Sequence, residues 1–253
     1  MMFQKLTEHI YLRPCEFYTD RPNIGLICGG KRTLLFEAGN SAAHVRQMKQ
    51  ELSDGGLPQP ELAAVSHWHW DHTFGMAAWG VPVIACGETD RMLRTVETWA
   101  WDDASMARRL ETGEDILFCE EMIRREYPNR EEIRVQPADI VFDRALRVDL
   151  GGGVECLLLR AGGPHAADSV ICYVPSDRFL FLGDANGKDL YGQPWHFDLA
   201  HEEDLVPTLA ALPYDQALVD QLIRVLDTLD FDLCVGGHAA PMSREELYRS
   251  LLL

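Results

Sequence analysis

The chain has 253 residues, of which 47% are hydrophobic and 25% are charged, a composition typical of one folded domain and not of a disordered segment. Its 40 acidic and 23 basic side chains give a net charge of −17, so the protein repels phosphate backbones, and nucleic acid is excluded as the expected partner. No apolar run approaches the length needed to span a bilayer, and the N-terminus lacks the features of a signal peptide. We therefore expect a single domain with no membrane partner.

The seven cysteines are odd in number and scattered, and no two of them form a Cys-x-x-Cys pair. Four of them, Cys28, Cys156, Cys172 and Cys234, lie in apolar strand-like runs, where a free thiol behaves as a small hydrophobic side chain. A disulfide framework is therefore not expected, and a reducing, cytoplasmic compartment is the predicted location.

The first predicted elements are two strands and a helix. Residues 23–28 and 33–36 are apolar and predict strands, which residues 29–32 join as a glycine-containing hairpin turn. Ser41 is a typical N-cap for a helix that extends through Leu52, after which an aspartate and two glycines end it.

A dense group of polar side chains follows the next apolar run, residues 62–65. His67, His69, Asp71 and His72 fall within six consecutive positions directly after this predicted strand. In an extended chain, residues two apart point to the same side, so His67 and His69 can bind one metal ion together. Asp71 and His72 follow where the chain turns into a short predicted helix, so they face elsewhere. Two pairs of ligands indicate two adjacent metal ions. The alternative is a pair of core histidines beside a helix start, which this density of metal-type side chains disfavours.

Helical signals replace strand signals between residues 88 and 136. Residues 88–110 read as largely helical, and residues 114–127 place four apolar side chains on one helical face. Trp99 and Trp101 lie two residues apart, which on a helix separates them by about 200°. If this stretch is helical, the two rings cannot share a face, so one packs on the core and the other faces out.

A metal ion needs three or four protein ligands, so later parts of the chain must supply more of them. Three further apolar runs read as strands, and each leads through glycine to a metal-type side chain: residues 156–159 to His165, residues 179–182 to Asp184, and residues 231–235 to His238. This repeated pattern predicts that all three side chains lie on loops at the same edge of a sheet.

The segment after Asp184 begins at a metal ligand, so its side chains are expected to pass near the metal ions. Four of them are candidates for a substrate pocket: Lys188, Tyr191, Trp195 and His196. The rest of the chain predicts helices at about 202–211 and 214–229. A last helix starts at Ser243, where the sequence matches a capping box.

The complete ligand set resembles that of the metallo-β-lactamase superfamily of binuclear metal hydrolases. The resemblance covers nearly the whole chain, because the ligands run from residue 67 to residue 238 in the family's order. It implies one domain, residues 1–253, with the α/β fold of a four-layer αββα sandwich and the metal ions at one edge between the sheets. Two mixed sheets with helices outside them also agree with the observed alternation of strand and helix signals.

The resemblance also implies a role for each ligand. The first metal ion is expected at His67, His69 and His165, the second at Asp71, His72 and His238, with the carboxylate of Asp184 bridging both. Asp71 is in addition the catalytic residue expected to accept a proton from the nucleophile. Nitrogen and carboxylate ligands without thiolate suit two zinc ions, and manganese or iron also fits this ligand type. The family usually has Asp-Thr/Ser-Gly where this chain has Glu37-Ala38-Gly39, so no role is assigned to Glu37.

The interval from His72 to His165 is longer than compact members of the family need. We interpret the excess, residues 88–136, as a helical cap-like insertion that forms the substrate pocket together with the 185–197 loop. Trp99 and Trp101 are then candidates for an apolar wall of this pocket. A helical pair packed on an outer face, or a dimer contact, is the alternative interpretation.

The expected activity is hydrolysis of a small ester, lactone or thioester by a metal-bridging hydroxide, because two ions about 4 Å apart lower the pKa of a shared water toward ~7. Asp184 argues against a true β-lactamase, since the resemblance places Cys or Ser at this position in those enzymes. Three alternatives remain open: a phosphodiesterase of the same fold, an iron-dependent dioxygenase-like oxidoreductase, and a non-catalytic metal-binding protein. The expected partner is a small-molecule substrate, and the oligomeric state stays open.

Overall fold

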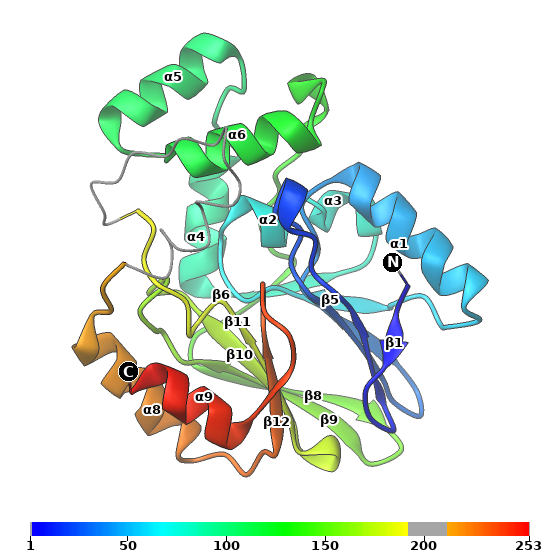
Figure 1. Ribbon diagram of the computed structural model, residues 1–253. Helices are drawn as coiled ribbons and strands as arrows, with labels where there is room; N and C mark the ends of the chain where they lie inside the picture. The colour runs from blue at the N-terminus through cyan, green and yellow to red at the C-terminus, as the bar shows by residue number, and fades with distance from the viewer. Residues whose placement is uncertain (1, 192–211, 253) are drawn as a thin grey trace.

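The computed structural model describes residues 2–191 and 212–252. In this part of the chain the strands form two sheets that pack face to face, with helices on their outer faces (Figure 1). This is the predicted αββα sandwich. The first sheet contains, in spatial order, β1 (Gln4–Lys5), β2 (Ile10–Arg13), β3 (Ile24–Cys28), β4 (Thr33–Phe36), β5 (Leu62–Ala64), β6 (Val83–Cys86) and β7 (Ile140–Phe142).

The second sheet has a different chain order, because its strands come from the second half of the sequence. Its spatial order is β13 (Met242–Ser243), β12 (Leu233–Gly236), β11 (Phe179–Gly183), β10 (Val170–Val174), β9 (Val154–Arg160) and β8 (Ala145–Gly151). β11 and β12 are parallel, whereas β10 runs antiparallel to both β9 and β11. The carboxyl ends of β9, β11 and β12 therefore point to the same edge of the sheet.

The central strands are apolar on both faces, because one face packs in the core between the sheets and the other packs against helices. The ring of Phe36 on β4 lies 5.5 Å from the ring of Phe181 on β11, measured between centroids. Gly25 on β3 makes room for this contact, since a Cβ atom there would lie 2.4 Å from Phe181 Cε1. The other face of each sheet is covered by helices, so both faces of these strands are removed from water.

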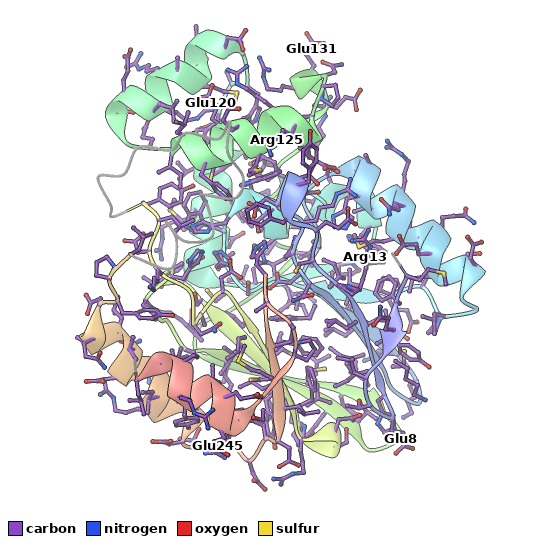
Figure 2. The ribbon with its side chains drawn as sticks, viewed as in Figure 1. Glu8, Arg13, Glu120, Arg125, Glu131 and Glu245 are labelled. Carbon is purple, nitrogen blue, oxygen red and sulfur yellow. The ribbon has the colours of Figure 1, made fainter. Side chains whose placement is uncertain are left out.

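The outer face of the first sheet is covered by α1 (Ala42–Asp54), α3 (Met76–Trp79) and α4 (Gly87–Val96). Ser41 caps α1 as predicted, because its Oγ accepts a hydrogen bond from the backbone N–H of His44 at 2.9 Å. Arg13 at the end of β2, labelled in Figure 2, is fully buried. Its Nε donates to Glu51 of α1 at 3.0 Å. An arginine buried at this depth is tolerated because its charge is paired.

The second sheet is covered by α8 (Gln216–Leu226) and α9 (Arg244–Leu251) (Figure 1). α8 falls inside the predicted 214–229 helix, and α9 starts after Ser243 with the predicted capping box. The helix predicted at about 202–211 lies outside the described residues. All seven cysteines are free thiols, and in the described part of the chain no helix is both long and apolar enough for a membrane span.

Residues 88–136 are largely helical, as predicted, but not continuously so. α4 ends at Val96, and α5 (Asp103–Thr112) and α6 (Leu117–Glu126) follow at one end of the sandwich (Figure 1). Residues 97–102 form a non-helical connection because a new helix begins after Asp102, whose carboxylate accepts from the N–H groups of Ala104 and Ser105. Both tryptophans of this region lie in the connection, so the helical spacing assumed for them does not apply.

Candidate metal centre

The polar motif after β5 is held in shape by side chains around it. His67 and His69 lie on the loop that follows β5, and Asp71 and His72 lie on the short helix α2 (Trp70–Thr73). The buried carboxylate of Asp168 accepts hydrogen bonds from the backbone N–H of Trp68 at 3.0 Å and from Thr89 Oγ1 at 2.8 Å. These bonds fix the loop between the two histidines, so their side chains stay on one side.

The second sheet contributes further candidate ligands, which reach the motif because the backbone passes very close to its neighbours at two glycines. Asp184 follows β11 directly, and His238 follows β12 after one residue, Gly237. A Cβ atom on Gly237 would lie 2.0 Å from Asp184 Oδ1, and one on Gly183 would lie 2.4 Å from Ser66 Cβ. Gly183 also has a φ of 52°, in the left-handed region that favours glycine. These glycines are therefore required for the sheet edge to approach the motif.

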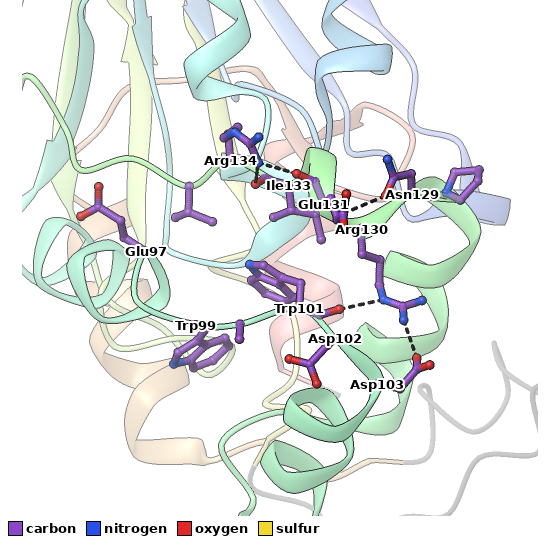
Figure 3. Close-up of a pocket in the computed structure, with 13 residues that line it drawn as sticks. Glu97, Trp99, Trp101, Asp102, Asp103, Asn129, Arg130, Glu131, Ile133 and Arg134 are labelled. Carbon is purple, nitrogen blue, oxygen red and sulfur yellow. Dashed lines mark hydrogen bonds and ion pairs between the residues drawn. The ribbon is translucent and has the colours of Figure 1, made fainter.

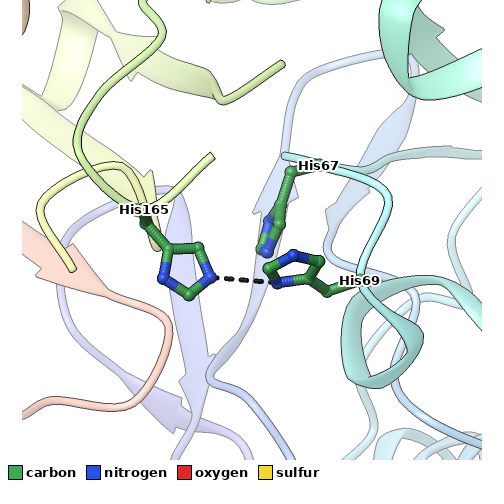
Figure 4. A group of neighbouring side chains, drawn as sticks. All are labelled: His67, His69 and His165. Carbon is green, nitrogen blue, oxygen red and sulfur yellow. Dashed lines mark hydrogen bonds between the residues drawn. The ribbon is translucent and has the colours of Figure 1, made fainter. Parts of the chain in front are cut away.

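The first group of ligands consists of His67, His69 and His165, whose ligand atoms all lie within 4.8 Å of one another. Figure 4 shows the three rings turned toward one another, with His69 Nδ1 3.0 Å from His165 Nε2. His67 Nδ1 lies 2.8 Å from Ser66 Oγ, and its Nε2 is buried without a hydrogen-bond partner in the described residues. A buried nitrogen without a partner is costly, and a cation at the middle of the three rings would satisfy it.

The second group consists of Asp71, His72, Asp184 and His238, and its ligand atoms also lie within 4.8 Å of one another. Asp71 Oδ2 lies 2.8 Å from His72 Nε2 and accepts from His238 Nε2 at 3.1 Å. Two imidazoles and two carboxylates are a donor set that fits a divalent ion.

Asp184 lies between the two groups. Its Oδ2 is 3.6 Å from His165 Nε2 of the first group and 3.5 Å from His72 Nε2 of the second. The same oxygen is 3.6 Å from His238 Nε2. This is the position that a carboxylate needs in order to bridge two metal ions.

In the first group, two of the histidines have an outer ring nitrogen, Nδ1, that faces a neutral group. His165 Nδ1 donates to the backbone carbonyl of Lys188 at 2.8 Å, and His67 Nδ1 faces the Ser66 hydroxyl. Such partners orient an imidazole and select the tautomer that leaves the other nitrogen free for a metal.

In the second group, the outer ring nitrogen of His72 faces a carboxylate instead. Glu37 Oε2 lies 3.2 Å from His72 Nδ1 and accepts from the N–H of Ser66 at 3.2 Å. Glu37 is buried and has a φ of 75°, an uncommon conformation for a residue other than glycine. No role was predicted for Glu37 from the sequence, because its longer side chain replaces the family's usual Asp. The structure shows that this longer side chain reaches His72.

Asp20 is a further carboxylate at this centre that sequence analysis did not identify. Its Oδ1 lies 3.7 Å from His238 Nδ1, and its side chain contributes to the wall of the cavity over the ligands. Burial, together with the charge of Asp71, raises the pKa of Asp20 to about 7. No local sequence signal marks Asp20, because its partner is in the last part of the chain.

The electrostatics differ between the two groups. Burial lowers the pKa of His67 and His69 well below the usual range, and the neighbouring imidazoles add to the effect, so both rings are neutral. Burial alone would lower the pKa of His238, but the carboxylates of Asp184 and Asp71 raise it to about 10. The second group therefore attracts positive charge strongly, which a bound cation supplies.

A cavity of about 310 Å³ opens over the ligands. Its wall contains Lys188 and Tyr191, two of the predicted pocket residues, together with Phe17, Phe118, Cys119 and Leu190. The ring of Tyr191 lies 5.2 Å from the ring of His69, and its hydroxyl donates to Asp115 at 3.3 Å. Trp195 and His196, the other two predicted pocket residues of this loop, lie outside the described residues.

Trp99 and Trp101 do not contribute to the wall of this cavity. They line a separate cavity of about 580 Å³ beside α5, where Arg130 and Arg134 lie opposite them (Figure 3). Both rings lie 4.6 Å from the guanidinium of Arg109 and 5.9 Å from each other. The two rings share a contact because the chain is not helical at this point.

Comparisons with known proteins agree with this geometry. Similar folds occur in a metallo-β-lactamase from Pontibacter korlensis, with a TM-score of 0.62, 17% identity and coverage of 99% of this chain and 97% of that chain. A metallo-β-lactamase from Hirschia baltica has a TM-score of 0.58, 17% identity and coverage of 99% and 95%. A comparison with curated protein sequences finds no match. The sequence profile of the metallo-β-lactamase superfamily matches residues 18–238, so the chain belongs to this superfamily.

Proposed function

We propose that the protein is a binuclear metal-dependent hydrolase that cleaves a small ester, lactone or thioester. The superfamily and the clustered histidines and aspartates support metal-dependent hydrolysis. The position of Asp184 Oδ2, 3.6 Å from His165 Nε2 and 3.5 Å from His72 Nε2, is the observation that supports two ions. A carboxylate between two nitrogen-containing groups is in a position to bridge a pair of ions, which supports the proposal.

Zinc is the ion that we propose for both positions, because the two groups consist of imidazoles and carboxylates without thiolate. Two bound zinc ions would lower the pKa of a coordinated water toward ~7 and polarise a substrate carbonyl. The chain contributes neutral, oriented imidazoles in the first group, where burial keeps the rings of His67 and His69 unprotonated.

We assign Asp71 as the residue that orients the attacking nucleophile by accepting its hydrogen bond. It lies at the cavity wall, with Oδ2 held between the Nε2 atoms of His72 and His238. Burial would raise the pKa of Asp71, but the charge of His72 and the hydrogen bonds of both histidines outweigh burial and hold it well below its usual range. An ionised carboxylate at this position accepts a hydrogen bond and so orients the nucleophile.

The cavity favours a small, largely apolar acyl substrate. A volume of about 310 Å³ is at the lower end for ligand pockets, and Phe17, Phe118 and Leu190 supply apolar wall. Asp20 adds a carboxylate to the same wall, and the chain carries a net charge of −17. The net negative charge of the whole chain disfavours a phosphodiester, so an ester, lactone or thioester is the preferred class.

A metal-reconstituted activity screen tests the proposal. Protein stripped with a chelator is loaded with zinc, manganese or iron and assayed against esters, lactones, thioesters, phosphodiesters and lactams. We expect turnover with zinc on at least one carbonyl substrate. Turnover restricted to phosphodiesters, or dioxygen consumption with iron in place of hydrolysis, would contradict the proposed class.

A matched pair of variants separates the site from the scaffold. Asp184→Asn removes the bridging charge and is expected to abolish turnover. Asp220→Asn removes an exposed carboxylate on α8, whose contact is with Gln216, and is expected to leave turnover unchanged. Equal activity of the two variants would contradict the role given to Asp184.

A further inference from the structure

The loop before β3 brings a carboxylate to His238 from the opposite end of the chain. Asp20 Oδ1 lies 3.7 Å from His238 Nδ1, whereas His238 Nε2 faces Asp71 Oδ2 at 3.1 Å and Asp184 Oδ2 at 3.6 Å. The ligand nitrogen of His238 is therefore Nε2, and Asp20 faces the nitrogen on the other side of the ring.

The loop that carries Asp20 has a defined backbone. Glu16 and Arg21 exchange two backbone hydrogen bonds, of 2.8 and 2.9 Å, and the short 3-10 helix η1 (Phe17–Thr19) lies between them. Asp20 follows with φ 52° and ψ 44°, and its N–H donates to the carbonyl of Phe17 at 3.1 Å. Aspartate and asparagine tolerate this left-handed conformation better than most residues.

Two neighbours of Asp20 attach the loop to its surroundings. Arg21 donates to both carboxylate oxygens of Glu126 on α6, at 3.0 and 3.2 Å. Asn23 Nδ2 donates to the carbonyls of Gly236 and Ala239, both at 2.7 Å, and the Asn23 N–H donates to the Gly237 carbonyl at 2.6 Å. The loop of His238 is thus bonded on both sides of the histidine to the segment that carries Asp20.

The placement of Asp20 is costly unless a cation compensates it. Its side chain is only 13% exposed, and it lies in the field of two further carboxylates, Asp71 and Asp184. Burying a third negative charge here costs desolvation and repulsion. A cation bound at His238 offsets that cost, because it attracts the carboxylate of Asp20.

We propose that Asp20 is a positioning residue for the second metal ion and acts through His238. Its charge favours the proton on Nδ1 of His238, which leaves the lone pair of Nε2 for the metal ion. Carboxylates that face the outer nitrogen of a ligand histidine have this effect on tautomer and ligand strength in metal proteins. The inference rests on the proposed function, since it requires a second ion at Asp71, His72 and His238.

Zinc titration of Asp20→Asn against a competing chelator tests this proposal, with the zinc content checked by elemental analysis. Asparagine keeps the shape and tolerates the backbone conformation but lacks the charge. We expect the second zinc ion to bind about tenfold more weakly and the first ion to bind as in the unchanged protein. Nitrogen-15 NMR of the zinc-loaded protein should also show a changed signal for the His238 ring.

Asp177→Asn is the matched control, because Asp177 also faces a histidine, with Oδ2 2.9 Å from His9 Nδ1, but neither residue belongs to the metal centre. Asp177→Asn should bind both ions normally. Asp20→Gly serves as a second test, since glycine accepts a φ of 52° and removes the carboxylate completely.

Three outcomes would overturn the inference. An unchanged second affinity in both Asp20 variants would show that the carboxylate has no effect on His238. Equal weakening of both ions would indicate a general structural role for the loop. Uptake of a single ion by the unchanged protein would contradict the proposed binuclear function itself, and the inference with it.

Discussion

The two halves of the proposed metal centre differ in the groups that face the outer ring nitrogens of their histidines. In the first half the outer nitrogens of His67 and His165 face a hydroxyl and a backbone carbonyl. In the second half those of His72 and His238 face the carboxylates of Glu37 and Asp20. The first half is therefore a neutral set of ligands shaped by hydrogen bonds, whereas the second is a negatively charged set that depends on a cation.

This difference shows how one edge of the sandwich can provide two metal positions with different electrostatic environments. The first half takes its ligands from loops of both sheets and needs burial to keep its rings neutral. The second half adds the carboxylate of Asp71 to that of the shared Asp184, and both face His72 Nε2. Replacing a carboxylate by an amide should therefore weaken binding of the second ion. Removing a neutral hydrogen bond should weaken binding of the first ion.

The largest effect is expected for Asp184→Asn, because Asp184 belongs to both halves. Binding of the second ion should weaken by more than the roughly 10- to 100-fold cost of losing an outer partner, with a smaller loss at the first position. Isothermal titration with zinc measures both steps. A variant that binds two ions with the original affinities would show that Asp184 does not bridge them.

Glu37→Gln should have the next largest effect, confined to the second half. Its contact with His72 Nδ1 at 3.2 Å is shorter than that of Asp20 with His238, so we expect the second ion to bind about 10- to 100-fold more weakly. Glu61→Gln, which changes an exposed carboxylate bonded to the N–H of Thr33, is the control. If Glu37→Gln weakens the first ion instead, the division of the centre is wrong.

Ser66→Ala should have a smaller effect, and on the first half. One neutral hydrogen bond contributes about 1 kcal/mol, so the first ion should bind roughly fivefold more weakly while the second is unchanged. Competition with a chelator of known affinity resolves a change of this size. Weaker binding of the second ion alone would contradict the assignment of His67 to the first group.

Trp99→Ala should not change metal binding at all. Its ring lies against Arg109 and Trp101, so the variant should lose about 1 to 3 kcal/mol of stability in chemical denaturation. Tyr191→Ala is the contrasting variant, because Tyr191 lies at the cavity wall over His69 and its removal should change KM. A changed KM in Trp99→Ala would place this tryptophan at the substrate, as the sequence analysis proposed.

Local patterns were sufficient to predict the fold and to single out the seven side chains that the structure brings together as candidate metal ligands. Each ligand follows an apolar run through a short turn, so the periodicity of the strands places it at a sheet edge. The partners behind the ligands could not be found this way. Asp20 and Glu37 meet His238 and His72 through tertiary packing, and neither carries a local signal. The helical spacing considered for Trp99 and Trp101 does not apply, because the chain leaves the helix at Glu97, before the cap formed by Asp102.

The most direct test of the binuclear centre is the number of zinc ions that the unchanged protein binds. Metal-free protein is titrated with zinc, and bound zinc per chain is measured by elemental analysis after removal of free metal. We expect two ions per chain, the second of which binds selectively more weakly in Glu37→Gln. Saturation at one ion per chain would contradict the binuclear centre on which the proposed hydrolysis depends.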